Sequence, residues 1–299
     1  MTKTVEEIIT KGSDLIVKGN IDEAEALFLS GIDSYKDSAS CYNNLGMIKL
    51  LKSEIDDSIK YLEKALELDP KILEAYQNLG SCYLYKELPD KAENMYVKAL
   101  QIDPDNFNTY HNLSTLYIQT QQYSKAKKSL EKILQLDEMN YQAAFMLGTI
   151  YLSLKEYYPA MANLLYSLKL KEDFNNAKIA LAEAYYKMGR YKMALKELNS
   201  ILLSEPNLVT PYVKSAIILI ETGRNNEAIP FLENAIKIDS SNTEILEMLA
   251  ILYEQFLNRD KAEELYQEIL IIDPMHKSAS EALERLSDLP DNLTESLFS

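Results

Sequence analysis

Cysteine and histidine are scarce in this chain, with only two residues of each among 299. A disulfide framework needs more cysteines in a smaller chain, so Cys41 and Cys82 are expected to be free, buried thiols. His111 and His276 lie far apart in the sequence, and no residues show the spacing of a metal site. The sequence therefore predicts no metal and no other cofactor.

Glycine and proline are also infrequent, with eight and nine residues, which excludes collagen-like and low-complexity chains. No apolar run approaches the roughly 18 residues of a membrane-spanning helix. The opening residues 1–7 carry two carboxylates where a secretory signal would need an apolar core. We therefore expect a cytoplasmic protein that has no membrane partner.

Basic residues are fewer than acidic ones. The chain has 31 lysines and arginines and 46 aspartates and glutamates, which gives a formal net charge of −15. Proteins bind nucleic acids chiefly through lysine and arginine, which release counterions from the phosphates. The charge balance thus argues against a nucleic-acid partner. Residues 209–299 are the most acidic part, with 17 acids and 7 bases.

What the chain does contain is a period of 34 residues. Counting from position 24, every 34th residue is small: Ala24, Ser58, Ala92, Ala126, Ala160, Ala194, Ala228 and Ala262. Twelve positions upstream of each is another small residue: Gly12, Gly46, Gly80, Ser114, Gly148, Ala182, Ala216 and Ala250. Small residues let helices approach closely, and a fixed period is typical of stacked structural units.

Each 34-residue window contains two blocks of apolar residues with helical periodicity. Polar breaks such as Lys86–Asp90 separate the two blocks, and pairs such as Asp69-Pro70 end the second block, since the residue before proline avoids the helical region. Each window is therefore predicted to be a pair of antiparallel helices. The eight windows are residues 5–38, 39–72, 73–106, 107–140, 141–174, 175–208, 209–242 and 243–276.

The third window carries the fullest set of recurring residues: Tyr76, Gln77, Asn78, Leu79, Gly80, Tyr83, Ala92, Tyr96, Ala99 and Pro104. This set resembles the tetratricopeptide repeat, and the resemblance covers about nine tenths of the chain. It implies an all-α fold, an α-solenoid that forms a right-handed superhelix of antiparallel helix pairs. Residues 277–287 are expected to form a C-terminal cap helix that completes an array domain of residues 1–287. Residues 288–299 are expected to be a short, flexible tail.

In tetratricopeptide arrays the first helices line the concave surface, so the resemblance implies that window positions 2, 6, 9 and 13 face a bound ligand. Position 6 is asparagine in three consecutive windows, at Asn44, Asn78 and Asn112. An asparagine amide both donates and accepts, so it can pair with the N–H and the C=O of an extended peptide. The pattern resembles the asparagine ladders of the O-linked N-acetylglucosamine transferase and kinesin light chain arrays. The alternative is that asparagine is simply a tolerated consensus residue there.

Other residues are expected to line a peptide-binding groove around the asparagines: Gln77, Ser81, Tyr85, His111, Thr115, Gln119, Phe145, Met146 and Thr149. An acidic groove end is expected from Glu183, Glu221, Glu244, Glu247 and Glu254. Like charges along a groove attract the opposite charge, which favours a partner with a basic stretch toward the C-terminal repeats. The alternative is an ordinary solvated acidic face.

The predicted function is a non-enzymatic scaffold or adaptor that holds an extended peptide segment of a partner protein in the concave groove. No phosphate-binding loop, metal spacing or activated nucleophile is visible, so no residue is predicted to be catalytic. The alternative is a substrate-recruiting module for a separate catalytic partner such as a glycosyltransferase, or for secretion or assembly machinery. Self-association also stays open, since Leu289, Leu293 and Leu297 of the tail could dock into a groove.

Overall fold

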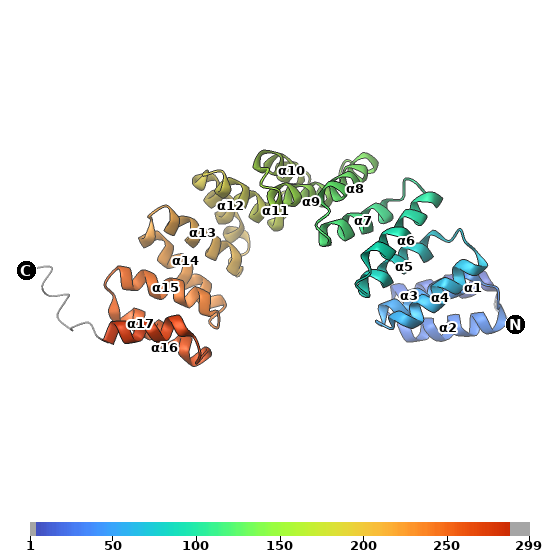
Figure 1. Cartoon of the computed structure of the whole chain (residues 1–299), viewed down its shortest axis with the longest axis horizontal. Coiled ribbons are helices and arrows are strands. Elements are labelled where there is room, and N and C mark those ends of the chain that lie inside the picture. The colour runs from blue at the N-terminus through green and yellow to red at the C-terminus, as the bar shows by residue number, and fades with distance from the viewer. Residues whose placement is uncertain (1–3, 288–299) are drawn as a thin grey trace, which may run out of the picture. The chain divides into compact units, whose positions relative to one another are not determined.

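The computed structural model describes residues 4–287, which form 17 α-helices and no strand (Figure 1). The first helices of the pairs are α1 (Val5–Val17), α3 (Ala39–Leu51), α5 (Leu73–Tyr85), α7 (Phe107–Gln119), α9 (Tyr141–Ser153), α11 (Asn175–Lys187), α13 (Val209–Glu221) and α15 (Thr243–Gln255). The second helices are α2 (Ile21–Ser34), α4 (Ile55–Leu68), α6 (Pro89–Ile102), α8 (Tyr123–Leu136), α10 (Tyr157–Leu170), α12 (Tyr191–Ser204), α14 (Asn225–Ile238) and α16 (Arg259–Ile272). The last helix is α17 (Lys277–Ser287).

The helix lengths repeat as regularly as the sequence does. Every first helix has 13 residues and every second helix has 14. The predicted all-α repeat solenoid is therefore confirmed. The tail that was predicted at residues 288–299 lies outside the described residues.

Each turn from a first to a second helix is built around one residue with a positive φ angle. These residues are again 34 positions apart: Gly19, Ser53, Glu87, Gln121, Lys155, Gly189, Gly223 and Leu257. In the first turn, the N–H of Gly19 donates to the Ile16 carbonyl and the N–H of Asn20 to the Leu15 carbonyl. This is the Schellman pattern, which satisfies the last carbonyls of a helix with a left-handed residue. Only three of the eight positions are glycine, so the turn conformation is kept without the residue that adopts it most readily.

The two columns of small residues lie where the helices of a pair meet. All eight residues of the column that begins at Ala24 are fully buried. The upstream column is equally buried, and Gly12, Gly46 and Gly80 leave no room for a side chain. A Cβ atom on Gly80 would lie 2.4 Å from Cε1 of Tyr96, and one on Gly46 would lie 2.4 Å from Cγ of Leu62. The small residues thus allow the two helices of each pair to pack closely, which explains why small residues recur at these positions.

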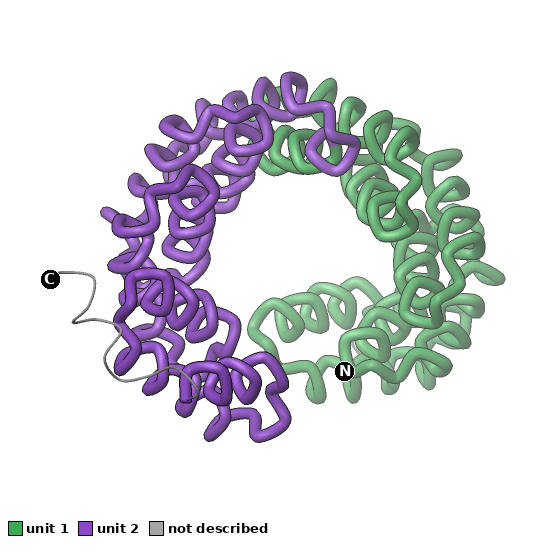
Figure 2. Tube along the Cα trace, turned by 60° about the vertical axis from the view of Figure 1, so that its left-hand side comes forward, with its two compact units in different colours: residues 1–150 green, residues 151–299 purple. Residues whose placement is uncertain are grey.

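The chain divides into two compact units, residues 1–150 and 151–299, and the boundary falls within α9 (Figure 2). Within each unit, helices pack mainly on the helices next to them in the sequence, such as α3 on α4 and α15 on α16. The first unit has cores around Phe28, Leu62 and Leu130. The second has a continuous core that runs from α13 to α17.

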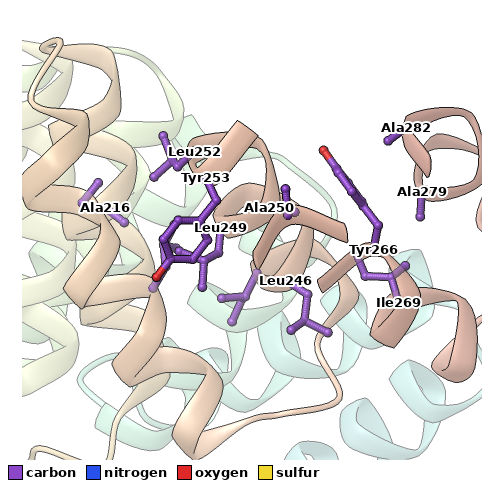
Figure 3. Packing of buried hydrophobic residues seen from close by; sticks show 14 of the residues in the cluster. Ala216, Leu246, Leu249, Ala250, Leu252, Tyr253, Tyr266, Ile269, Ala279 and Ala282 are labelled. Atoms are coloured by element: carbon purple, nitrogen blue, oxygen red, sulfur yellow. The ribbon is translucent and has the colours of Figure 1, made fainter. Parts of the chain in front are cut away.

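Helix α17 closes the second unit by packing on α16. Ala279 and Ala282 lie beside Tyr266 and Ile269 of α16 (Figure 3), and Leu286 is buried in the same cluster. Apolar surface removed from water is worth about 25 cal/mol per Å². The helix therefore shields an apolar face that α16 would otherwise expose.

Two fully buried serines differ in whether their hydroxyl groups have a hydrogen-bond partner. The hydroxyl of Ser58 donates to the Gly46 carbonyl at 2.6 Å and lies 3.1 Å from the sulfur of Cys82. The hydroxyl of Ser215 has no hydrogen-bond partner within residues 4–287, at a window position that is leucine in six other repeats.

We expect the two alanine variants of these serines to change stability in opposite directions. Ser58→Ala should lower the free energy of unfolding by about 1 kcal/mol, because it removes a satisfied hydrogen bond. Ser215→Ala should leave that free energy unchanged or raise it by about 1 kcal/mol, because it removes a buried hydroxyl without a partner. Urea unfolding followed by circular dichroism measures both. Equal losses in the two variants would contradict the expectation.

Candidate functional site

The three asparagines of window position 6 lie on α3, α5 and α7, all in the first unit, and α5 contacts both of the other helices. Each asparagine is half-buried. Asn44 donates from Nδ2 to the Ser40 carbonyl at 2.9 Å, and Asn78 donates to Oδ1 of Asn43 at 3.4 Å. Asn112 makes no side-chain hydrogen bond to any described residue. None of the three amide oxygens therefore accepts a hydrogen bond from a described residue.

Two of the expected groove residues, Gln77 and Ser81, form hydrogen bonds within the fold. The amide nitrogen of Gln77 donates to Oδ1 of Asn106 at 2.9 Å and to Oγ1 of Thr109 at 2.8 Å. Asn106 is the N-cap of α7, so Gln77 ties α5 to the start of the next first helix. The hydroxyl of Ser81 donates to the Gln77 carbonyl at 3.1 Å and lies 3.4 Å from the hydroxyl of Tyr96. Both side chains thus have structural partners that the sequence did not indicate.

The remaining expected groove residues of the first unit are of two kinds. Tyr85, His111 and Gln119 are exposed, and Tyr85 keeps 65% of its surface accessible. Phe145, Met146, Thr115 and Thr149 are half-buried. The hydroxyl of Thr115 donates to the His111 carbonyl at 3.1 Å, and that of Thr149 to the Met146 carbonyl at 2.8 Å. The exposed set is the part that a ligand can reach without displacing side chains.

The acidic residues of the second unit are mostly engaged by neighbouring side chains. Glu183 pairs with Lys214 at 3.2 Å, and Glu254 pairs with Arg285 at 2.8 Å. The hydroxyl of Tyr186 donates to Glu221, and that of Ser278 donates to Glu247. Glu244 is exposed and has no partner among the described residues. The expected acidic end is therefore weaker than the charge count indicates, because two of its carboxylates are neutralised by ion pairs.

Neighbouring glutamates also raise the pKa values of two tyrosines. The hydrogen bond to the Glu221 carboxylate, with some burial, raises the pKa of Tyr186 to about 12. Burial, together with the neighbouring Glu254 carboxylate, raises the pKa of Tyr266 to about 12. Both hydroxyls therefore keep their protons beyond the pH at which an ordinary tyrosine ionises, and they act as hydrogen-bond donors.

The second unit also contains a cavity that no column of the sequence indicated. It has a volume of about 160 Å³, is partly open to solvent, and lies between α11, α12 and α13. Its lining residues are Ala182, Glu183, Tyr186, Lys187, Leu198, Lys214, Ile217 and Ile218. The cavity forms between successive repeats, so a pattern within one repeat could not reveal it. The signals in the sequence were Glu183, Lys214 and Ile217, which stand at window positions 9, 6 and 9, on the side expected to face a ligand.

Reactive groups are few in the part of the chain that the structure describes. Cys41 and Cys82 are free and buried, as expected, and burial raises the pKa of the Cys82 thiol. No group of three or more histidine, cysteine, aspartate or glutamate side chains within residues 4–287 could hold a metal ion. None of the described helices has the length and apolar character needed to cross a membrane.

Comparisons with known proteins agree with the repeat architecture. Tetratricopeptide repeat family models match residues 37–105 and 84–144. The model of anaphase-promoting complex, cyclosome, subunit 3 matches residues 119–199, and that of the Psidin N-terminal TPR repeats region matches residues 184–285. No curated protein sequence matches the chain.

Three solved structures illustrate the shared fold. YrrB, described as a TPR protein with an unusual peptide-binding site, is 23% identical with a TM-score of 0.53, over 62% of this chain and 95% of YrrB. A tetratricopeptide repeat protein from Parabacteroides merdae is 21% identical with a TM-score of 0.58, over 83% of this chain and 98% of that protein. MamA is 25% identical with a TM-score of 0.51, over 54% of this chain and 95% of MamA. With its 34-residue helix pairs and these matches, the chain belongs to the tetratricopeptide repeat family.

Proposed function

We propose that this chain is a non-enzymatic scaffold or adaptor that holds an extended peptide segment of a partner protein against its first helices. Tetratricopeptide repeat proteins are in general non-catalytic protein-interaction scaffolds. The observation that carries the proposal is the series Asn44, Asn78 and Asn112, whose amide oxygens all lack an internal donor among the described residues. The proposed binding domain is the array of eight repeats, with α17 as its cap.

The spacing of the asparagines suits a peptide backbone. Adjacent packed helices lie roughly 8–10 Å apart, and an extended chain advances about 3.3 Å per residue. One asparagine would thus meet about every third residue of the segment. Amide groups pair with the backbone of any sequence, so exposed side chains beside them, Tyr85, His111 and Gln119, would supply the discrimination between partners. YrrB is described as having a peptide-binding site. The proposal of a peptide ligand for this chain is based on its own asparagines and not on the likeness to YrrB.

A basic stretch in the partner is a second part of the proposal, placed at the second unit. Its support is the exposed, unpaired Glu244 together with the excess of acids over bases in residues 209–299. A carboxylate already paired with a lysine or arginine attracts a further cation less. We therefore expect this electrostatic contribution to be smaller than that of the asparagines.

Affinity purification of the full chain, followed by mass spectrometry, would identify the partner, and hydrogen exchange would then locate it. Bound partner should protect backbone amides of α3, α5 and α7, while the outward second helices α4, α6 and α8 exchange as in the free chain. Protection confined to the second helices would overturn the proposal. A partner with catalytic activity would favour the substrate-recruiting alternative, and a contacting segment without lysine or arginine would contradict the basic stretch.

A further inference from the structure

The cavity between α11, α12 and α13 has the size and lining of a pocket for one apolar side chain. Its apolar walls come from Ala182, Leu198, Ile217 and Ile218. An apolar cavity of about 150 Å³ in another protein holds a benzene molecule, so 160 Å³ accommodates the side chain of a leucine, methionine or phenylalanine. All three helices belong to the second unit, and no other unit contributes to the lining.

Two lining residues supply polar atoms beside these apolar walls. Lys214 of α13 and Glu183 of α11 form an ion pair at 3.2 Å, with side chains 35% and 43% exposed. An ammonium group has three donors and a carboxylate has several acceptor sites, so the pair retains both kinds of hydrogen-bonding capacity. Lys214 occupies window position 6, where three repeats of the first unit have asparagine. The ion pair thus offers at that position a donor and an acceptor, as one asparagine amide does.

The charges around the cavity balance one another. Besides Glu183 and Lys214, Lys187 lies with its Nζ 5.1 Å from the ring centre of Tyr186, whose hydroxyl donates to Glu221. Two acids and two bases leave no net charge, so this surface does not select a charged group. It is complementary to a neutral backbone that carries an apolar side chain.

We propose that this cavity binds one leucine, methionine or phenylalanine side chain of an extended partner segment, whose adjacent backbone N–H and C=O bond to Glu183 and Lys214. The inference rests on the proposed function, since it assumes a segment bound along the first helices. It adds a position at which the identity of the partner's side chain matters. A segment with glycine or a charged residue at that position loses the apolar contact.

Small amides test the pocket without a partner protein. The full chain, labelled at its isoleucine methyl groups, is titrated with N-acetyl-leucine N-methylamide and with N-acetyl-glycine N-methylamide, and methyl resonances are followed by NMR. The leucine compound should shift the resonances of Ile217 and Ile218, and the glycine compound should not. Equal shifts with both compounds, or none with either, would overturn the inference. Either result leaves the exchange test of α3, α5 and α7 untouched, so the two failures are distinguishable.

A filling variant and its matched control sharpen the test. Ile217→Trp should occupy the cavity and weaken binding of the leucine compound by about tenfold to a hundredfold, the effect expected for losing a buried leucine side chain. Ile251→Trp changes the same window position on α15, where the residue is 42% exposed and is not part of this cavity's lining, and should bind like the parent. If Ile217→Trp does not fold by circular dichroism, Ile217→Ser should abolish the preference for leucine over glycine. Parental binding by a folded Ile217 variant would refute the site.

Discussion

A Gly80→Val chain is expected to unfold at a lower urea concentration than the parent, with a loss of about 1–3 kcal/mol. The Cβ of any side chain at this position would lie 2.4 Å from Cε1 and 2.7 Å from Cζ of Tyr96, far inside van der Waals contact. Tyr96 is 1% exposed, so its ring cannot move without displacing other core residues. Valine is a better helix former than glycine by less than about 1 kcal/mol, which is too little to offset the overpacking.

Two further variants show whether the clash with Tyr96 is the cause. Gly80→Ala should cost less than Gly80→Val, because the eighth repeat has Ala250 and Tyr266 at the corresponding positions and both are buried. Gly80→Val should cost less in a Tyr96→Ala background than in the parent, since residues in direct contact couple by about 0.5–3 kcal/mol in a double-mutant cycle. Strictly additive effects of the two substitutions would rule out the contact as the source of the loss.

Replacing Asn44, Asn78 and Asn112 together by alanine should weaken partner binding by roughly tenfold to a thousandfold. Each lost hydrogen bond is worth about 0.5–1.5 kcal/mol, and about 1.4 kcal/mol corresponds to a factor of ten in affinity. The melting temperature should change little, because Asn44 bonds only within its own helix and the bond from Asn78 to Asn43 is long, at 3.4 Å. Calorimetric titration with the identified partner segment measures the affinity.

The structure also ranks the single variants of this set. Asn112→Ala should weaken binding most, because this amide makes no hydrogen bond to a described residue and can offer all its groups to the ligand. The matched control is Asn94→Ala, an exposed asparagine on the second helix α6. It should bind as the parent does. If the triple variant kept the parental affinity, the asparagines would have no role in binding and would simply be residues that the repeat tolerates at this position.

The period of 34 residues was sufficient to predict the fold, because the same helix pair recurs with helices of 13 and 14 residues. The two columns of small residues were also interpreted correctly, since a buried helix contact constrains residue size directly. The positive-φ column from Gly19 to Leu257 could not be predicted, because the backbone conformation recurs there while the residue type does not.

The candidate site was less accessible to sequence reasoning than the fold. The amide of Gln77 bonds residues 29 and 32 positions away, and Glu254 pairs with Arg285, 31 positions away. Partners about one repeat apart become neighbours only when the units stack, and a residue's window position does not reveal which side chain the next repeat presents. The cavity beside Lys214 has the same origin. The fold could be predicted because the repeats share one residue pattern. The site could not, because it depends on side chains that differ from one repeat to the next.

The neighbour-to-neighbour packing of the helices within each unit has a consequence for how the chain is made. The main contacts join helices that are adjacent in sequence or one repeat apart, so they do not wait for a distant segment. Proteins dominated by such local contacts fold quickly, since little chain entropy is lost before contacts form. Synthesis proceeds from the N-terminus, where segments generally fold first. Within each unit, a chain emerging from the ribosome can therefore add each new helix pair to the pair already folded, and only the last pair leaves an apolar face uncovered.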